Sequence, residues 1–423
     1  MDDLGLFSKC KNTYNLTNQD FVGIEYNEND VTVYFPLGYE IPQTDEECRK
    51  SILTLLRTIS LSKTIINEEV KINDELKEDY AFPISAYLWV LKDYFTYGIY
   101  KSRDTIIQKN GNGKINWKKT LSKDPIISNG NLLYLDMFTE QNVAIDDIIT
   151  QIHILCLNES IKHIGWLFGN FELKSSLFSL DNKEYLLGIL NHALINTNED
   201  RKLNLLINLR NILLGLDVVS DDKSINNYGV RGFHDVWEIV VARLFGNQDV
   251  TGYKPVASYK LFDSSNSVQK QPLRLDGLLK RPNAYYILDA KYYKFGIDFD
   301  YHSAPETSDV EKQIVYGEYV DKVHNKKYPV YNSFVIPYNK NNNPRISDYH
   351  DNIVYVGYST VSWKCYDENV KPYYYVAIIM VDCRFALDNW AYNDSTEFIN
   401  DIVSKIEMVK PLLIENGWIL PSN

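Results

Sequence analysis

Three charged residues interrupt two apolar segments in the C-terminal half of the chain. Asp276 lies in the first segment, and Asp289 and Lys291 lie in the second. Pro282 and Asn283 separate the segments and are typical turn residues, so the pattern predicts a β-hairpin. Strand side chains alternate between two faces, which places Asp289 and Lys291 on the same face. The hairpin can bring Asp276 beside Asp289, so that two carboxylates and an ammonium meet at the edge of an apolar sheet.

This cluster fits metal-dependent hydrolysis of a phosphodiester. Two carboxylates can hold Mg²⁺ through oxygen ligands, while water and a substrate phosphate fill the other positions, and Mn²⁺ is expected to substitute. The metal makes hydroxide available near neutral pH, and a nearby lysine can orient the attacking water or stabilise the phosphate. A simpler interpretation stays open, in which Asp289 and Lys291 form an ion pair at the sheet margin and Asp276 is a turn residue.

Composition limits the class of protein. The 423 residues suffice for two or three domains, and 45% hydrophobic and 24% charged residues are ordinary for a soluble globular protein. The cysteines lack CxxC spacing, which indicates reduced thiols instead of a zinc site or a disulfide framework. The N-terminus has no signal-peptide pattern, and the longest apolar run, residues 373–381, is too short for a bilayer, so we expect a cytoplasmic protein without a membrane partner.

The net charge of −12 argues against a protein that coats nucleic acid by charge alone. The most basic stretch is residues 109–123, where Lys114, Lys118 and Lys119 are candidate DNA contacts. A solvated strand face explains these lysines equally well. The glycines of the stretch lack the G-x-x-x-x-G-K-[ST] pattern, so a glycine-rich hairpin turn is favoured over a phosphate-binding loop.

Periodicity predicts helices and strands along the whole chain. The first half is expected to hold a hairpin over 20–36, a strand over 130–138, and helices over 45–61, 84–100, 143–166 and, as a pair, 183–216. A polar loop over 217–228 separates an N-terminal α+β domain, residues 1–228, from a C-terminal domain, residues 229–423. The second half is expected to hold helices over 229–247, 307–322 and 395–414, the hairpin, a polar loop over 296–303, and strands over 333–338, 352–358 and 373–381. This order predicts an α/β protein of mixed α+β type, with a mixed C-terminal sheet flanked by helices.

Asp276, a twelve-residue gap and the run Asp289-Ala290-Lys291 resemble the PD-(D/E)XK nuclease signature. Leu275 stands where that signature usually has proline. The resemblance implies an accessory acid at Glu238, because these folds often use a carboxylate from the helix just upstream of the hairpin. Pairing of Glu238 with a nearby arginine, Arg231 or Arg243, is the alternative. The resemblance also implies that polar groups of the next helix line the site, and the candidates there are Lys312 and Gln313.

A second resemblance covers most of the chain. The segments FHDVWE, RLDGLL, YYILDAKYY and EKQIVYGEY, between Gly232 and Tyr319, resemble the LlaJI-type restriction endonucleases, which are related to the McrC nuclease subunit of McrBC-like systems. GKINWKKT, residues 113–120, is also similar to that family. The resemblance implies a Mg²⁺-dependent endonuclease of a bacterial restriction system that cuts double-stranded DNA. Asp276 and Asp289 are then metal ligands, Lys291 orients the water or stabilises the phosphate, and Glu238 is an additional acid that also binds the metal.

The same resemblance implies a separate partner, a McrB-like AAA+ GTPase or ATPase that recognises DNA and translocates. A nuclease that is delivered by a motor need not be basic, and residues 1–228 would then dock on the motor. Two other functions stay open. The chain could be a regulatory or scaffold subunit that stimulates the partner NTPase, or a standalone restriction enzyme with its own recognition domain in residues 1–228.

Overall fold

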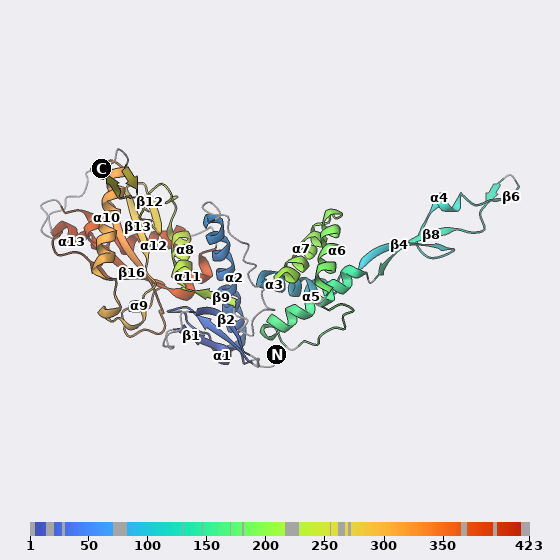
Figure 1. Cartoon of the computed structure of the whole chain (residues 1–423), viewed down its shortest axis with the longest axis horizontal. Helices are drawn as coiled ribbons and strands as arrows, with labels where there is room; N and C mark the ends of the chain where they lie inside the picture. Colours follow the sequence, from blue (N-terminus) through green and yellow to red (C-terminus); the bar gives the residue numbers. More distant parts are fainter. Residues whose placement is uncertain are drawn as a thin grey trace. The chain divides into compact units, whose positions relative to one another are not determined.

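The computed structural model divides the chain into two compact units (Figure 1). Unit 1 comprises Met1–Leu76 and Ser224–Asn423, and unit 2 comprises Lys77–Lys223. The structure describes residues 5–13, 21–27, 30–70, 83–129, 131–145, 147–169, 171–179, 182–215, 228–253, 255–260, 267–269, 272–364, 370–391 and 396–415. The predicted loop over 217–228 lies, except for Tyr228, outside the described residues, as does Cys365.

A five-stranded mixed sheet forms the centre of unit 1, in the order β12-β13-β14-β16-β15. Its strands are β12 (Gly277–Arg281), β13 (Ala284–Ala290), β14 (Val330–Tyr338), β15 (Ile353–Ser359) and β16 (Val376–Asp382). The three inner strands run parallel, and β12 and β15 pair antiparallel at the edges. Every residue of β13 is buried, which explains its nearly continuous run of aromatic and branched side chains.

Helices cover both faces of this sheet (Figure 1). They are α8 (His234–Phe245), which contacts β12 and β13, α10 (Thr307–Val323), which contacts β13, β14 and β16, and α12 (Thr396–Ile406), which contacts β14, β15 and β16. On the α10 face, Ile314 and Tyr316 belong to one core cluster with Phe334 of the sheet. Trp237 of α8 is fully buried, and its Nε1 donates to the backbone oxygen of Val335 at 3.0 Å. The predicted mixed sheet flanked by helices is confirmed.

The first 70 residues belong to the same unit as this sheet. A second sheet has the order β1-β3-β2-β9, with β1 (Cys10–Asn12), β2 (Phe21–Asn27), β3 (Asp30–Phe35) and β9 (Tyr228–Arg231). In it Phe21 lies opposite Arg231, and the long helix α2 (Asp45–Val70) contacts β2, β9 and α8. The compact units therefore differ from a division at residue 228, because the strand that completes the N-terminal sheet comes from beyond that point.

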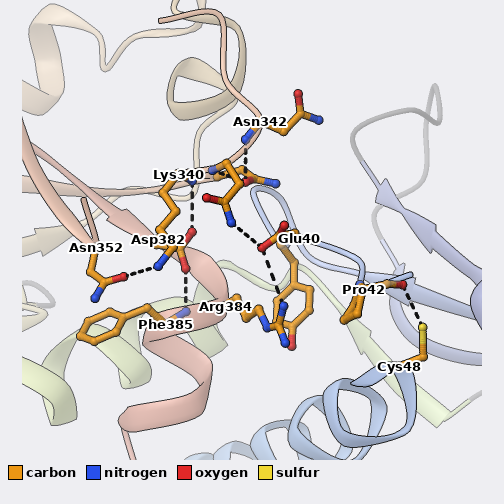
Figure 2. A network of polar contacts seen from close by, with 12 residues as sticks. Glu40, Pro42, Cys48, Lys340, Asn342, Asn352, Asp382, Arg384 and Phe385 are labelled. Carbon is orange, nitrogen blue, oxygen red and sulfur yellow. Dashed lines mark hydrogen bonds and ion pairs between the residues drawn. The ribbon is translucent and has the colours of Figure 1, made fainter. Parts of the chain in front are cut away.

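Polar contacts also join the N-terminal residues to loops beside the central sheet (Figure 2). Glu40 Oε2 accepts from Asn341 Nδ2 at 2.9 Å and lies 3.7 Å from Arg384 Nη1, at the start of α11 (Cys383–Asn389). The Leu37 backbone N–H donates to the Tyr292 hydroxyl at 2.7 Å. Tyr292 directly follows the catalytic candidate Lys291 in the sequence, so the N-terminal residues help to fix the chain beside the candidate site.

Unit 2 combines four helices with short strands. The helices are α3 (Ile84–Tyr97), α5 (Ile148–Ile164), α6 (Lys183–Ile195) and α7 (Asp200–Gly215). The strands are β4 (Ser102–Lys109), β5 (Lys114–Ile115), β6 (Ile126–Ser128), β7 (Asn131–Leu133) and β8 (Phe138–Ile145), with the short helix α4 (Trp117–Thr120). Helix α3 contacts α5 and α7, and α6 contacts α7. The buried Asp93 of α3 forms a bidentate ion pair with Arg201 of α7, with both N–O distances at 3.0 Å.

Most predicted elements are present, and several differ in type or bounds. The helix expected over 45–61 continues to Val70, and the helix expected over 395–414 is interrupted by a 3-10 turn at Glu407–Val409. The stretch 109–123 is not a hairpin, because β4 and β5 each pair with β8, which lies between them. The strand expected over 130–138 is divided between β7 and the start of β8, and the helix expected over 143–166 begins only at Ile148, after the capping Asp147. The helix expected over 229–247 is preceded by β9, because the chain there completes the N-terminal sheet.

The segment 296–303, predicted as a polar loop, instead contains the short helix α9 (Phe295–Asp298) and the 3-10 helix Tyr301–Ser303. The backbone N–H groups of Asp300 and His302 donate to the carboxylates of Asp298 and Asp300, respectively, and the Ser303 hydroxyl donates to Asp298. These carboxylates therefore accept hydrogen bonds from nearby backbone N–H groups and from the Ser303 hydroxyl. The described cysteines are free thiols, as expected. Within the described residues, no helix combines the length and the apolar character that a membrane span requires.

Candidate active site

The β12–β13 hairpin brings the two predicted carboxylates together. A two-residue turn joins the strands, and Gly277 lies opposite Leu288. Asp276 immediately precedes this pair on one strand, and Asp289 follows it on the other. The Asp276 Oδ2 accepts a hydrogen bond from the Ala290 backbone N–H at 2.9 Å, which fixes the Asp276 side chain at the end of β13.

Lys291 lies on the same face as Asp289, as the strand alternation predicts. The Lys291 Nζ is 2.7 Å from Asp289 Oδ2, and Asp289 is only 1% exposed. In the register of the sheet Asp289 lies opposite Phe334, and the Lys291 Nζ is 5.8 Å from the centre of that ring. The Lys291 backbone N–H donates to the Val335 oxygen at 3.0 Å, so the β13–β14 pairing continues to this lysine. The ion pair is thus held inside an apolar face of the sheet.

A third carboxylate, which the sequence did not indicate, completes the cluster. Asp309, in the first turn of α10, has its Oδ1 3.1 Å from Lys291 Nζ. Its Oδ2 accepts from the Tyr293 hydroxyl at 3.1 Å. The spacing of residues in the sequence does not predict this contact, because it depends on how α10 packs against the end of β13.

The two hairpin carboxyls, Asp276 and Asp289, have raised pKa values. Burial raises the pKa of Asp276 well above its usual range, and the charges of Asp289 and Glu238 raise it further. Burial also raises the pKa of Asp289, although Lys291 opposes this shift. Burial lowers the pKa of Lys291, but Asp289 and Asp309 more than offset this and raise it overall. The cluster therefore carries more negative charge than its one ammonium neutralises, and a bound cation would relieve that excess.

Glu238 lies on α8, which contacts both strands of the hairpin. Burial raises the pKa of Glu238, and Asp235 and, more weakly, Asp289 add to the shift. Within the described residues Glu238 forms no ion pair with Arg231 or Arg243, so neither of the alternative pairings is found. Glu238 is therefore electrostatically coupled to the hairpin carboxylates.

The two polar residues predicted on α10 also lie near the cluster. Gln313 follows Asp309 by one helical turn and is fully buried, and within the described residues neither of its side-chain polar atoms has a hydrogen-bond partner. Lys312 lies with its Nζ 5.4 Å from the centre of the Tyr316 ring. After burial and Lys291, the charge of Lys312 also acts on Asp289, whose pKa it lowers. Both side chains are thus available to line the site.

The candidate DNA contacts belong to unit 2, whereas the candidate active site lies wholly in unit 1. Lys114 is on β5, and Lys118 and Lys119 are on α4. All three are exposed, and the Lys119 Nζ lies 5.1 Å from the centre of the Phe138 ring. The alternative of a solvated strand face applies only to Lys114, because the other two lie on a helical turn.

The donor set fits Mg²⁺. Among the described residues, no three His, Cys, Asp or Glu side chains are grouped closely enough to hold a metal ion together. The predicted set of three ligands is therefore not found in the described part of the chain, since Glu238 is not grouped with Asp276 and Asp289. The hairpin still supplies these two carboxylates, and Mg²⁺ is commonly bound by one or two carboxylates together with waters. Asp289 Oδ1 is buried, and the described residues supply no hydrogen-bond partner for it. Since buried carboxylate oxygens normally have partners, this atom is suited to accept a cation.

The comparison with protein families agrees with the resemblance to the LlaJI-type enzymes. The family model of the LlaJI restriction endonuclease matches residues 21–356, which is more than half of the chain and includes parts of both units. One similar solved structure is the refined half-complex from the tetradecameric assembly of Thermococcus gammatolerans McrB AAA+ hexamers with bound McrC. Its matching chain is 13% identical, with a TM-score of 0.38, and the match covers 91% of this chain and 83% of that one. No curated protein matches the chain. By the extent of the family match, the chain belongs to the LlaJI restriction endonuclease family.

Proposed function

We propose that the chain is the Mg²⁺-dependent endonuclease subunit of a bacterial restriction system and hydrolyses phosphodiesters of double-stranded DNA. The main support is the cluster at the end of β13, where Asp276, Asp289 and Lys291 converge and one buried Asp289 oxygen has no partner among the described residues. We assign the central sheet and its helices to the PD-(D/E)XK nuclease fold on the same ground. Membership of a restriction endonuclease family gives independent support.

In this proposal Asp276 and Asp289 hold the metal, and Mn²⁺ can replace Mg²⁺. When bound, the metal supplies an activated water near neutral pH and neutralises charge on the phosphate. Lys291 donates to the attacking water or to a phosphate oxygen, because its ammonium carries three donors and already lies beside Asp289. Glu238 acts as an accessory acid through its coupling to the hairpin carboxylates.

Gln313 and Lys312 line the site in this proposal. The buried amide of Gln313 offers both a donor and an acceptor that have no other use within the described residues. Lys312 adds positive charge where the scissile phosphate would approach, and its charge already acts on Asp289. Together they let an acidic chain hold a phosphate locally without a basic surface.

We further propose that a McrB-like AAA+ GTPase or ATPase brings DNA to this subunit. The net charge of −12 supports delivery by a partner, because the chain alone has little general attraction for DNA. We assign the docking role predicted for residues 1–228 to unit 2, which exposes large apolar side chains around α4, β6 and β7. These are Trp117, Leu121, Ile126, Ile127, Leu132, Leu133 and Leu135. Lys114, Lys118 and Lys119 lie in the same stretch and could contact DNA phosphates.

Plasmid cleavage tests the proposal. The wild type, Asp289→Asn and the exposed control Glu311→Gln are each incubated with Mg²⁺ or EDTA, with and without the partner and its nucleotide. We expect cleavage only with Mg²⁺ and partner, and a loss of more than about 100-fold in Asp289→Asn, since even residues behind the ligands cost about 10–100-fold. The Glu311→Gln control is expected to cut normally.

Two other results would redirect the assignment. If both Asp289 forms stimulate the partner NTPase equally and neither cuts DNA, the chain is a regulatory subunit. If the isolated chain cuts and binds a specific sequence, with affinity that falls steeply with salt, it is a standalone restriction enzyme.

A further inference from the structure

One lysine serves two carboxylates in the candidate site. The Lys291 Nζ is 2.7 Å from Asp289 Oδ2 and 3.1 Å from Asp309 Oδ1. The side chains of Lys291, Asp289 and Asp309 are 11%, 2% and 18% exposed, so water contributes little to their solvation. Asp289 Oδ2 is already paired with the ammonium, so a metal held by Oδ1, which has no partner among the described residues, would draw on the same carboxylate that holds Lys291.

Asp309 is held in place independently of Lys291. Its Oδ2 accepts from the Tyr293 hydroxyl at 3.1 Å and from the Glu306 backbone N–H at 3.1 Å. The second contact is part of the capping box that begins α10, in which the Glu306 side chain in turn receives a backbone N–H. A carboxylate that is fixed by a helix start and a tyrosine keeps its position when the neighbouring side chains move. Oδ1 is thereby left to face Lys291.

We propose that Asp309 is a positioning residue that retains Lys291 when Asp289 also holds a metal through Oδ1. Without Asp309, Asp289 would be the carboxylate partner left to Lys291 among the described residues, and a metal on Asp289 would weaken that pairing and leave a nearly buried ammonium poorly paired, which is costly. With Asp309 in place, Lys291 keeps a charged acceptor at 3.1 Å and stays beside the reacting phosphate. The inference rests on the proposed metal-dependent function and adds to it how the ammonium and the metal share one carboxylate.

The test measures metal binding and needs no DNA. Free Mn²⁺ is followed by electron paramagnetic resonance during titration of the full chain. We expect Asp309→Asn to weaken Mn²⁺ binding about tenfold, the lower end of the effect of residues behind metal ligands. Asparagine still offers an oxygen to the Glu306 N–H, so the helix start is preserved. Glu311→Gln, an exposed change of equal charge two residues away on α10, is expected to bind Mn²⁺ as the wild type does.

Asp309→Asn in a Lys291→Met variant distinguishes a positioning role of Asp309 from the effect of its negative charge alone. If Asp309 acts through Lys291, then Asp309→Asn has no further effect on Mn²⁺ binding once Lys291→Met is present. An equal weakening in both backgrounds would show that Asp309 only adds negative charge, and unchanged binding in the Asp309→Asn single variant would also overturn the inference. Tyr293→Phe, which removes one contact to Asp309, should weaken binding in the same direction but less, and it replaces Asp309→Asn if that variant does not fold. A wild type that binds no Mn²⁺ would instead refute the proposed function itself.

Discussion

At the residue scale, the site concentrates like charges where the surrounding core opposes ionisation. Asp276 accepts one backbone N–H, and Asp289 has one ammonium, but burial still raises the pKa of both carboxyls. A group whose pKa is higher in the folded state stabilises the fold at low pH and loses that contribution as the pH rises through its folded pKa. The ionised hairpin carboxylates therefore lower the stability of the fold at neutral pH, and a bound cation would offset this loss.

This reasoning predicts that Asp276→Asn raises the melting temperature at neutral pH without divalent ions. Asparagine keeps an acceptor for the Ala290 N–H and removes a buried charge. The gain should be absent below about pH 4, where an aspartate of ordinary pKa is protonated in the unfolded chain, and should grow as the pH rises above it.

Thermal denaturation from pH 4 to pH 8 measures this difference. Adding Mg²⁺ should raise the melting temperature of the wild type by mass action and leave Asp276→Asn nearly unchanged. A wild type that is more stable than the variant at every pH would contradict the charge argument.

At the scale of single elements, close packing decides how α10 presents Asp309 and Gln313. Gly317 lies in the middle of that helix, and a Cβ there would overlap the Cβ of Tyr373 and approach its Cγ to 2.7 Å. The glycine allows the helix to lie directly against the chain that leads into β16. This contact fixes the distance between α10 and the sheet. It thereby also fixes the distance between the side chains of Asp309 and Lys291.

Gly317→Ala is expected to destabilise the protein, although alanine is the better helix former by about 1 kcal/mol. Overpacking typically costs about 1–3 kcal/mol, and here the obstacle is a fixed Cβ instead of a flexible side-chain end. The matched control is Gly188→Ala in α6, where a Cβ would meet nothing within 4 Å, so this change should stabilise by about 0.5–1 kcal/mol. Urea denaturation of both variants measures whether each substitution raises or lowers the free energy of unfolding. Stabilisation by Gly317→Ala would refute the packing argument.

The elements that the sequence predicted correctly are those that are specified locally. The turn at Pro282 and Asn283 and the alternation from Ile287 to Lys291 are short-range signals, and they led to the hairpin and to the predicted ion pair. Asp309 could not be found in this way, because its partner lies across a helix–strand contact. In the same way, Gly229 to Arg231 was assigned to a helix because the pairing with β2 is invisible in local periodicity.

At the scale of the whole molecule, the chain is one unit with another inserted in it. Lys63 of α2 has its Nζ 5.1 Å from the centre of the Tyr228 ring, so residues that precede and follow unit 2 in the sequence contact each other within unit 1. Unit 2 has its own core, in which the bidentate Asp93–Arg201 ion pair ties α3 to α7. A substitution in the core of one unit is therefore expected to destabilise that unit and to leave the other unchanged.

Asp93→Asn should loosen unit 2 selectively. Asp93 is buried, and removing its charge leaves Arg201 without its carboxylate partner, at a cost of about 1–3 kcal/mol. Hydrogen exchange followed by mass spectrometry should show faster exchange in α3 and α7 and unchanged exchange in β13 and β14. Equal acceleration in both units would contradict the assignment of separate cores.

The position of β9 also imposes an order of events on the ribosome. Strand β2 is made early, but its neighbour β9 is made only after all of unit 2, and at about 5–20 residues per second this delay is on the order of ten seconds or more. During that interval one edge of β2 has unpaired backbone groups, which is a risk for wrong association. The hairpin with Asp276 and Asp289 and the helix with Asp309 emerge later still. A nascent chain therefore lacks part of the candidate site at a stage when all residues of its inserted unit have been made.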